Sequence, residues 1–192
     1  MTCCAVGMYS LTGDSSAGCM PCQAGKFNPA TGAKTCTDCP PGSYSSDGVA
    51  CVLCPAGSSQ PNSGATSHTA CQIAPAGKFV ALPGSDAAKD CVGGTHSPND
   101  GATMCDICPA GTHSSAGADE CTLCSAGYIA AATGSTECLL CSAGTFAPNK
   151  GSSICELCPP GKHSAAGGSS CTECGDSYFS AAGSTECQSC SA

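Results

Sequence analysis

The sequence predicts a small disulfide-rich fold: an elongated tandem array of about eleven short hairpin-like loops, with few short β-strands, mostly coil and no helix. Three observations predict this class. Cysteine makes up 22 of the 192 residues, which is typical of a disulfide scaffold. A CxxC motif recurs about every 17 residues. The chain has only 7 Leu, 4 Ile, 5 Val and no Trp, too few large apolar side chains to bury a core without cross-links.

The CxxC motifs divide the chain into repeating segments. We call the second Cys of each motif the opener, the first Cys of the next motif the closer, and the segment between them a rung. A position +n lies n residues after the opener. Gly, Pro and Ser are too dense for helices. The eleven openers are Cys4, Cys22, Cys39, Cys54, Ala74, Cys91, Cys108, Cys124, Cys141, Cys158 and Cys174, and the closers are Cys19, Cys36, Cys51, Cys71, Ala88, Cys105, Cys121, Cys138, Cys155, Cys171 and Cys187.

The fifth rung indicates which cysteines pair. Alanine replaces both its opener, Ala74, and its closer, Ala88, while its turn glycine and its aromatic residue remain. If each opener bonds the closer of its own rung, this rung lacks both cysteines of one bridge, and no other cysteine loses its partner. If the cysteines bonded within each CxxC, Cys71 and Cys91 would each lack a partner. The paired replacement therefore favours opener-to-closer bonds, which spacing alone does not decide.

Opener-to-closer bonding predicts ten disulfides and leaves two cysteines over. A bridge that closes a loop of about 15 residues contributes about 3 kcal/mol in the chain-entropy model, so we expect the bridges to be the main stabilisers. Cys3 and Cys190 remain as candidates for intermolecular bridges. The predicted pairs are Cys4–Cys19, Cys22–Cys36, Cys39–Cys51, Cys54–Cys71, Cys91–Cys105, Cys108–Cys121, Cys124–Cys138, Cys141–Cys155, Cys158–Cys171 and Cys174–Cys187.

Glycines at fixed positions predict the turns. Gly stands at +3 in ten of the eleven rungs, with Ser177 as the exception. Pro at +1 would suit a type I turn that begins at the opener. However, Pro41 and Pro160 stand at +2, which such a turn disfavours. We therefore expect an extended, polyproline-like segment up to this glycine. A second Gly, four residues before the closer in eight rungs, predicts the return turn.

Larger side chains gather at two positions of the rung. Position +5 is aromatic or His in nine rungs, and only Ser59 and Ile129 depart from this rule. The residue before the opener is often aliphatic. We expect a thin spine in which each ring packs against a disulfide and a neighbouring aliphatic side chain. The residues are Tyr9, Phe27, Tyr44, Phe79, His96, His113, Phe146, His163 and Phe179 at +5, and Leu53, Ile73, Ile107, Leu123, Leu140 and Leu157 before the openers.

The regular period fails between Cys54 and Cys91. The loop from Cys54 to Cys71 is the longest and lacks the aromatic residue, and the next rung lacks its bridge. The sequence therefore predicts three regions: four cysteine-rich rungs over 1–71, an irregular rung without a disulfide over 72–90, and six cysteine-rich rungs over 91–192. The stretch from Cys54 to Cys91, which we call the irregular region, is expected to be either a flexible joint or a contact site.

Cysteine usage and charge limit the location and the partners. Disulfides persist in oxidising compartments, so we expect an extracellular or cell-surface protein. The net charge of −8, with six Lys and no Arg, disfavours nucleic-acid binding. No apolar run approaches the roughly 20 residues of a membrane span. No N-glycosylation sequon occurs, although the Ser- and Thr-rich loops could carry O-linked sugars.

Metal binding and catalysis are the competing interpretations of the cysteines and histidines. Repeated CxxC pairs resemble zinc ribbons, but ribbons belong to reducing compartments, and this continuous array has no grouping into fours. Redox CxxC chemistry needs a low-pKa thiolate, usually at a helix N-terminus. His96, His113 and His163 share +5 with Phe and Tyr, so we interpret them as aromatic spacers. We therefore predict no catalytic, cofactor-binding or metal-binding residues.

One segment carries a family resemblance. The stretch CPAGTHSSAGADECTLCSAG, Cys108–Gly127, resembles the ephrin-receptor-like cysteine repeats, and the resemblance covers essentially the whole chain. It implies a disulfide-linked extracellular array of the kind found in receptor ectodomains and in surface proteins of protists and algae. Members of such families serve as stalks, spacers, coats and ligand-binding modules. The motif brings no catalytic residues with it.

Two functions fit these expectations. The first is a structural extracellular protein, the subunit of a filament, surface hair or matrix, whose rigidity comes from the disulfide ladder. It would assemble with itself, head to tail through Cys3 and Cys190. The second is a surface coat antigen or receptor-like segment that binds a partner, glycans included, through the irregular loops between Gly57 and Lys89. Enzymatic activity is a distant third.

Overall fold

The computed structural model describes residues 3–190. Contacts between residues divide the chain into two units. The first unit runs to Asp90 and includes Asn99–Met104, and the second consists of Cys91–Pro98 and the residues from Cys105 onward. The irregular rung, 72–90, lies in the first unit. Both units are built from the same repeating element.

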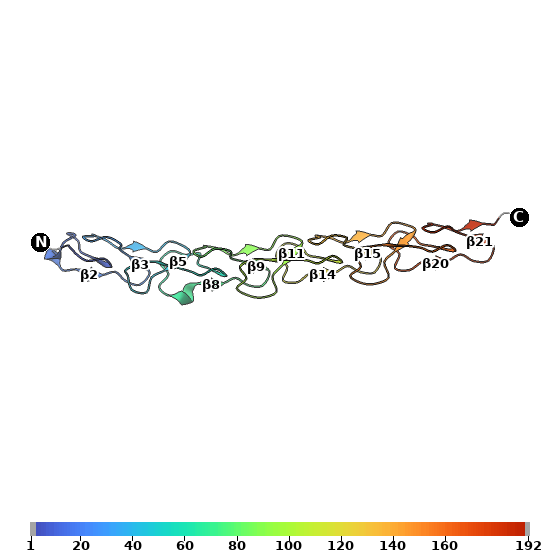
Figure 1. Cartoon of the computed structure of the whole chain (residues 1–192). Coiled ribbons are helices and arrows are strands. Elements are labelled where there is room, and N and C mark those ends of the chain that lie inside the picture. Colours follow the sequence, from blue (N-terminus) through green and yellow to red (C-terminus); the bar gives the residue numbers. More distant parts are fainter. Residues whose placement is uncertain (1–2, 191–192) are drawn as a thin grey trace. The chain divides into compact units, whose positions relative to one another are not determined.

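That element is a two-stranded antiparallel hairpin, and eleven such hairpins occur in residues 3–190. Figure 1 labels several of their strands. The first strand of each hairpin occupies +4 and +5 of a rung. The second strand consists of the two residues between the closer of that rung and the next opener, so Thr112 and His113 pair with Leu123 and Thr122. These two residues, which the sequence presents only as connections between rungs, therefore form one strand of every hairpin.

Every strand is two residues long, which explains the predicted predominance of coil. The first strands are β1 Met8–Tyr9, β3 Lys26–Phe27, β5 Ser43–Tyr44, β7 Ser58–Ser59, β9 Lys78–Phe79, β11 Thr95–His96, β13 Thr112–His113, β15 Tyr128–Ile129, β17 Thr145–Phe146, β19 Lys162–His163 and β21 Tyr178–Phe179. The second strands are β2 Met20–Pro21, β4 Thr37–Asp38, β6 Val52–Leu53, β8 Gln72–Ile73, β10 Lys89–Asp90, β12 Asp106–Ile107, β14 Thr122–Leu123, β16 Leu139–Leu140, β18 Glu156–Leu157, β20 Thr172–Glu173 and β22 Gln188–Ser189.

Helical structure in residues 3–190 is limited to two single 3₁₀ turns, η1 at Ser15–Ala17 and η2 at His68–Ala70. The Asp14 side chain caps η1 by accepting a hydrogen bond from the Ser16 amide. The predicted fold class, a disulfide-rich array of short hairpins without α-helices, is confirmed for the described residues. Within this same part of the chain, no helix has the length and apolar character needed to cross a membrane.

The turn before each first strand differs from the sequence prediction. It is a β-turn over +1 to +4, closed by a hydrogen bond from the +4 amide to the +1 carbonyl, as from Ser43 to Pro40. The +3 glycine has a positive φ, +82° at Gly42, and Pro41 precedes it. Positive φ at the third residue after Pro at the second is the pattern of a type II turn. In such a turn the residue before the glycine is extended, as expected, and the sequence prediction lacked only the closed turn, which begins one residue after the opener.

Consecutive rungs are joined by a recurring set of backbone hydrogen bonds. The +3 glycine amide donates to the +6 carbonyl of the next rung, as from Gly94 to Ser114 at 2.9 Å. The amide of the return-turn glycine donates to the carbonyl of the opener of the preceding rung, as from Gly134 to Cys108 at 2.8 Å. Because these bonds use only main-chain atoms at fixed positions, each rung is held in the same register on its neighbour.

The core consists of cysteines and small side chains. Openers from Cys39 to Cys158 are at most 1% exposed. The second buried position is +6, which is at most 8% exposed in every rung and carries no aromatic or charged side chain. A bulkier residue at a buried position between rungs would force neighbouring rungs apart. The +6 residues are Ser10, Asn28, Ser45, Gln60, Val80, Ser97, Ser114, Ala130, Ala147, Ser164 and Ser180.

The predicted spine is only partly correct. The rings at +5 are half-buried, except Phe179, which is 51% exposed. The aliphatic side chains before the openers are 48–66% exposed and do not form a buried spine. They lie instead beside return-turn glycines: the Leu123 Cδ2 is 2.7 Å from where a Cβ on Gly151 would stand. Gly151 has no side chain to cover Leu123, so part of the leucine surface stays exposed to solvent.

Candidate functional sites

The disulfides form a ladder with one bridge for each regular rung. The Cα–Cα separations are 5.6–5.8 Å, within the usual range for disulfides. The structure brings the twenty cysteines together in the pairs expected from the sequence. These are Cys4–Cys19, Cys22–Cys36, Cys39–Cys51, Cys54–Cys71, Cys91–Cys105, Cys108–Cys121, Cys124–Cys138, Cys141–Cys155, Cys158–Cys171 and Cys174–Cys187.

The two remaining cysteines, Cys3 and Cys190, are exposed free thiols. Cys190 occupies the opener position of the last CxxC motif, and its amide donates to the Ser177 carbonyl at 2.8 Å, as the other openers do to their preceding turns. The backbone of Cys3 pairs with that of Asp14 in an isolated antiparallel β-bridge. Both thiols are therefore accessible to a partner cysteine.

The rung without a disulfide keeps its hairpin. β9 and β10 pair in the usual register, with Lys78 opposite Asp90. Ala74 is 1% exposed, in the place of a buried opener sulfur. A hollow of about 270 Å³, lined in part by Lys78, Asp86 and Ala88, lies where this rung meets the preceding one. The backbone ladder thus sustains a rung without its cross-link.

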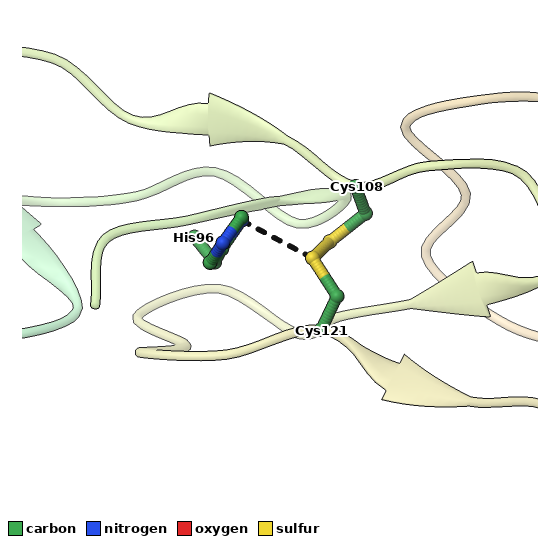
Figure 2. Close-up of side chains that lie close together, drawn as sticks. All are labelled: His96, Cys108 and Cys121. Carbon is green, nitrogen blue, oxygen red and sulfur yellow. Dashed lines mark hydrogen bonds between the residues drawn. A yellow bond between two sulfur atoms is a disulfide. The ribbon is translucent and has the colours of Figure 1, made fainter.

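Three histidines lie against disulfides of the following rung. Their Nδ1 atoms are 3.1–3.2 Å from the Sγ atom of a closer cysteine, and Figure 2 shows the His96 ring facing the Cys108–Cys121 bridge. In each case one ring nitrogen of the histidine and the two Sγ atoms lie within 4.8 Å of one another. We call these the histidine clusters: His96 with Cys108 and Cys121, His113 with Cys124 and Cys138, and His163 with Cys174 and Cys187.

The state of the sulfur decides what a histidine cluster can do. The thiolate, not the disulfide, is the strong metal ligand. With the bridges closed, the clusters therefore offer a metal only an imidazole. His96 Nδ1 is 3.2 Å from the Asp106 carbonyl and His113 Nδ1 is 3.1 Å from that of Thr122. A carbonyl only accepts hydrogen bonds, so these contacts favour the tautomer with hydrogen on Nδ1.

A surface groove lies in the irregular stretch between Cys54 and Cys91. It has a volume of about 560 Å³, and its lining, mostly apolar, includes Ser58, His68, Thr69, Ile73 and Asp100. All the lining residues belong to the first unit. The groove lies inside the region for which the sequence predicted a contact site, extended by Asp100 and Gly101 from a later rung.

The groove owes its shape to the long loop between Cys54 and Cys71. The buried Gln60 side chain donates to the Ala70 carbonyl at 2.5 Å, which holds η2 against the rung. The exposed His68 ring meets the Tyr44 ring edge-on, with centroids 6.0 Å apart. On the opposite side, the Asp100 carboxylate accepts a hydrogen bond from the Ala76 amide at 2.9 Å. Contacts that involve four consecutive rungs thus fix the lining.

Local hydrogen bonds lower the pKa of two exposed carboxyl groups. For Asp14 the main cause is the Ser16 hydroxyl, followed by the Ser16 amide and the Thr12 hydroxyl. For Asp47 it is the Val49 amide. Hydrogen bonds to the ionised form favour it. Both residues stabilise loops, and neither lies in the groove or in a histidine cluster.

Comparison with known families identifies the repeat. The family model described as tyrosine-protein kinase ephrin type A/B receptor-like matches residues 30–71 and 127–174. These two segments are ephrin-receptor-like cysteine-rich repeats. The rungs between them share the hairpin, and all but the rung of Ala74 and Ala88 share the disulfide. Repeats of this family are extracellular in type and generally non-catalytic. Comparison with curated proteins finds no match.

Proposed function

Since residues 30–71 and 127–174 are ephrin-receptor-like repeats, we propose that this chain is a structural extracellular protein, the subunit of a filament, surface hair or matrix. Its task is mechanical, and it carries out no catalysis. Its principal partner is a second copy of itself. The disulfide content and the family both support an extracellular or cell-surface location.

The observation that carries this proposal is the repeated coupling of neighbouring rungs. Within the second unit the same glycine-to-opener hydrogen bond recurs at 2.8 Å from Gly117, Gly134, Gly151 and Gly167. In a tandem array each repeat contacts only near neighbours, so stiffness accumulates along the chain. A disulfide inside each regular rung prevents that rung from opening when the chain is pulled. Such a design suits a load borne along the array.

Head-to-tail growth through Cys3 and Cys190 is the covalent form of the proposal. Both are exposed, and a bond between Cys190 of one copy and Cys3 of the next forms a heterologous contact that extends without closing. Electrophoresis of the native protein without reductant should show a ladder of multimers that collapses to one band on reduction. The Cys190→Ser variant should remain monomeric. Monomers with two titratable thiols in the native material would eliminate covalent growth.

Direct imaging of the native material tests the wider proposal. Filaments, hairs or a regular matrix are expected, and antibodies to this chain should decorate them along their length. Dispersed molecules in the native material would contradict a structural role, whatever the state of the two thiols.

A binding role is the second candidate, and the groove in the irregular region favours it. Regular rungs would leave no loop like the one that carries η2. An extracellular glycan is a suitable probe, because the groove combines apolar lining with the polar His68 and Thr69 side chains. A Thr69→Trp change should block binding to an oligosaccharide array, and Ser63→Trp, on the same loop outside the groove, should not. Equal binding by the two variants would remove this candidate.

A further inference from the structure

We propose that the three histidine clusters are zinc sites that open on reduction. Breaking the bridge of a cluster yields two thiolates, which bind Zn²⁺ together with the adjacent imidazole. The array would then hold metal only where its disulfides are opened. This inference does not rest on the filament proposal.

The clusters are already close to the geometry that zinc needs. With Zn–S near 2.3 Å and Zn–N near 2.0 Å, tetrahedral ligands lie about 3.5–3.8 Å apart. The Nδ1–Sγ distances of 3.1–3.2 Å need only a small increase. The two sulfurs, about 2 Å apart when bonded, must separate by nearly another 2 Å. Rotation about the Cα–Cβ bonds supplies this movement, so the Cα atoms can stay 5.7 Å apart.

The reaction balances with a dithiol as reductant. Two electrons pass from the dithiol to the Cys108–Cys121 bond, the dithiol closes to its own disulfide, and both of its protons appear on the new cysteine thiols. Zn²⁺ then displaces these two protons and forms two Zn–S bonds. The His96 proton moves from Nδ1 to Nε2 through solvent, which frees the Nδ1 lone pair for the metal.

A fourth ligand position is open to solvent. The second cluster faces a hollow of about 380 Å³, lined by His113, Cys138, Tyr128 and three neighbouring residues. Three protein ligands plus water complete a tetrahedral zinc site. The closer cysteines of all three clusters are partly exposed, so a reductant and a metal ion can reach them.

Two other bridges provide a control within the same chain. Cys141–Cys155 follows the rung with Ile129 at +5, and Cys158–Cys171 follows the rung with Phe146. Their backbone geometry matches that of the clusters, with Cα–Cα separations of 5.7 Å. They lack the imidazole, so reduction gives them two thiols and no third ligand at +5.

The experiment opens bridges in the folded full-length chain with limiting trialkylphosphine, which becomes the phosphine oxide while water supplies the protons. Zn²⁺ is added, and the thiols are then alkylated and identified by mass spectrometry. Zinc should slow alkylation of the opened cluster cysteines at least about tenfold more than that of the opened control cysteines, because losing even an outer-shell partner costs 10–100-fold in affinity. Circular dichroism follows the hairpins throughout.

The matched variant replaces His96, His113 and His163 with Phe, the residue that Phe146 contributes at the same position. This variant should fold like the native chain and lose the selective protection. Co²⁺ in place of Zn²⁺ should give thiolate charge-transfer bands and tetrahedral ligand-field bands, both weakened in the variant. Equal protection in the two proteins, cluster bridges that resist the phosphine, or metal uptake only after the hairpins are lost would each overturn the proposal.

Discussion

The carbonyl oxygen of Gly151 lies 2.0 Å from the position that a Cβ atom on Gly111 would occupy. These two glycines belong to rungs two steps apart. The same relationship joins Gly94 to Gly134 and Gly144 to Gly183 at 2.0 and 2.1 Å. A rung therefore contacts its second neighbour as well as its first, through backbone that tolerates no side chain. The glycine at +3 is needed both for its turn and for this approach.

Gly111→Ala should be more damaging than the same change at Gly161. Both glycines have a positive φ, which costs a residue with a Cβ about 1–2 kcal/mol. Only Gly111 also meets a carbonyl, since nothing lies within 4 Å of a Cβ on Gly161. The clash should add about 1–3 kcal/mol. Amide hydrogen exchange of each variant, read at the mutated rung, measures the difference. Equal exchange in the two variants would show that the close approach does not exist.

Ser177→Gly should stabilise the last hairpin. Ser177 is the one non-glycine residue with positive φ in the described part of the chain, at +69°. Relieving this strain should contribute about 1 kcal/mol. The control Ser125→Gly changes an exposed residue at +1 without positive φ and should be neutral or slightly destabilising. Slower exchange of the Tyr178 and Cys190 amides, which donate in this hairpin, reports the gain.

Replacing Ala74 and Ala88 together by Cys should restore a disulfide in the irregular rung. The hairpin of this rung already has the register of the bridged rungs. A bridge over such a loop should stabilise the rung by about 3 kcal/mol in the chain-entropy model. Thiol titration should find no more free thiols than in the native chain, and the single Ala74→Cys variant should show one more. An unbridged pair in the double variant would mean that the rung departs from its neighbours.

The loop around η1 should loosen in acid. In the folded loop the pKa of Asp14 is lowered, mainly by the hydrogen bond from the Ser16 hydroxyl. A depressed pKa contributes stability that is present above the unfolded-state value and is lost as the pH falls through the folded-state value. The loop should therefore hold at neutral pH, and the protection factors of its amides, which correct for the pH dependence of intrinsic exchange, should fall below about pH 4. Asp14→Asn should show protection factors that do not change across this range, and native protection factors that are equally constant would contradict the assignment.

The repeat and its cross-links could be predicted because they are local in the sequence. Spacing defines the rungs, and the replacement of Ala74 and Ala88 as a pair indicates which cysteines bond. The +5 strand position also stands out as an aromatic column. The residues at +6 carry a weaker signal, the absence of Gly, Pro and charge in every rung from Ser10 to Ser180, which by itself does not indicate burial.

The groove and the histidine clusters could not be predicted in the same way. His96 contacts Cys121, 25 residues away, because the two-residue strands place this +5 side chain over the bridge of the next rung. The groove takes Asp100 from one rung and His68 from another. Such neighbours depend on how the rungs stack, which spacing within one rung does not reveal.

The sequence by itself determined the period, the cysteine pairing, the coil-rich class and the positions of the turns, because each depends on residues within one rung. The tertiary structure decided the rest. It made the turn type II, left Leu123 and its counterparts in solvent, buried the +6 residues and brought Gly111 against Gly151. The physical reason is that these features depend on backbone approaching backbone across rungs. Where two backbones approach this closely, whether a residue has a side chain at all matters more than how hydrophobic that side chain would be.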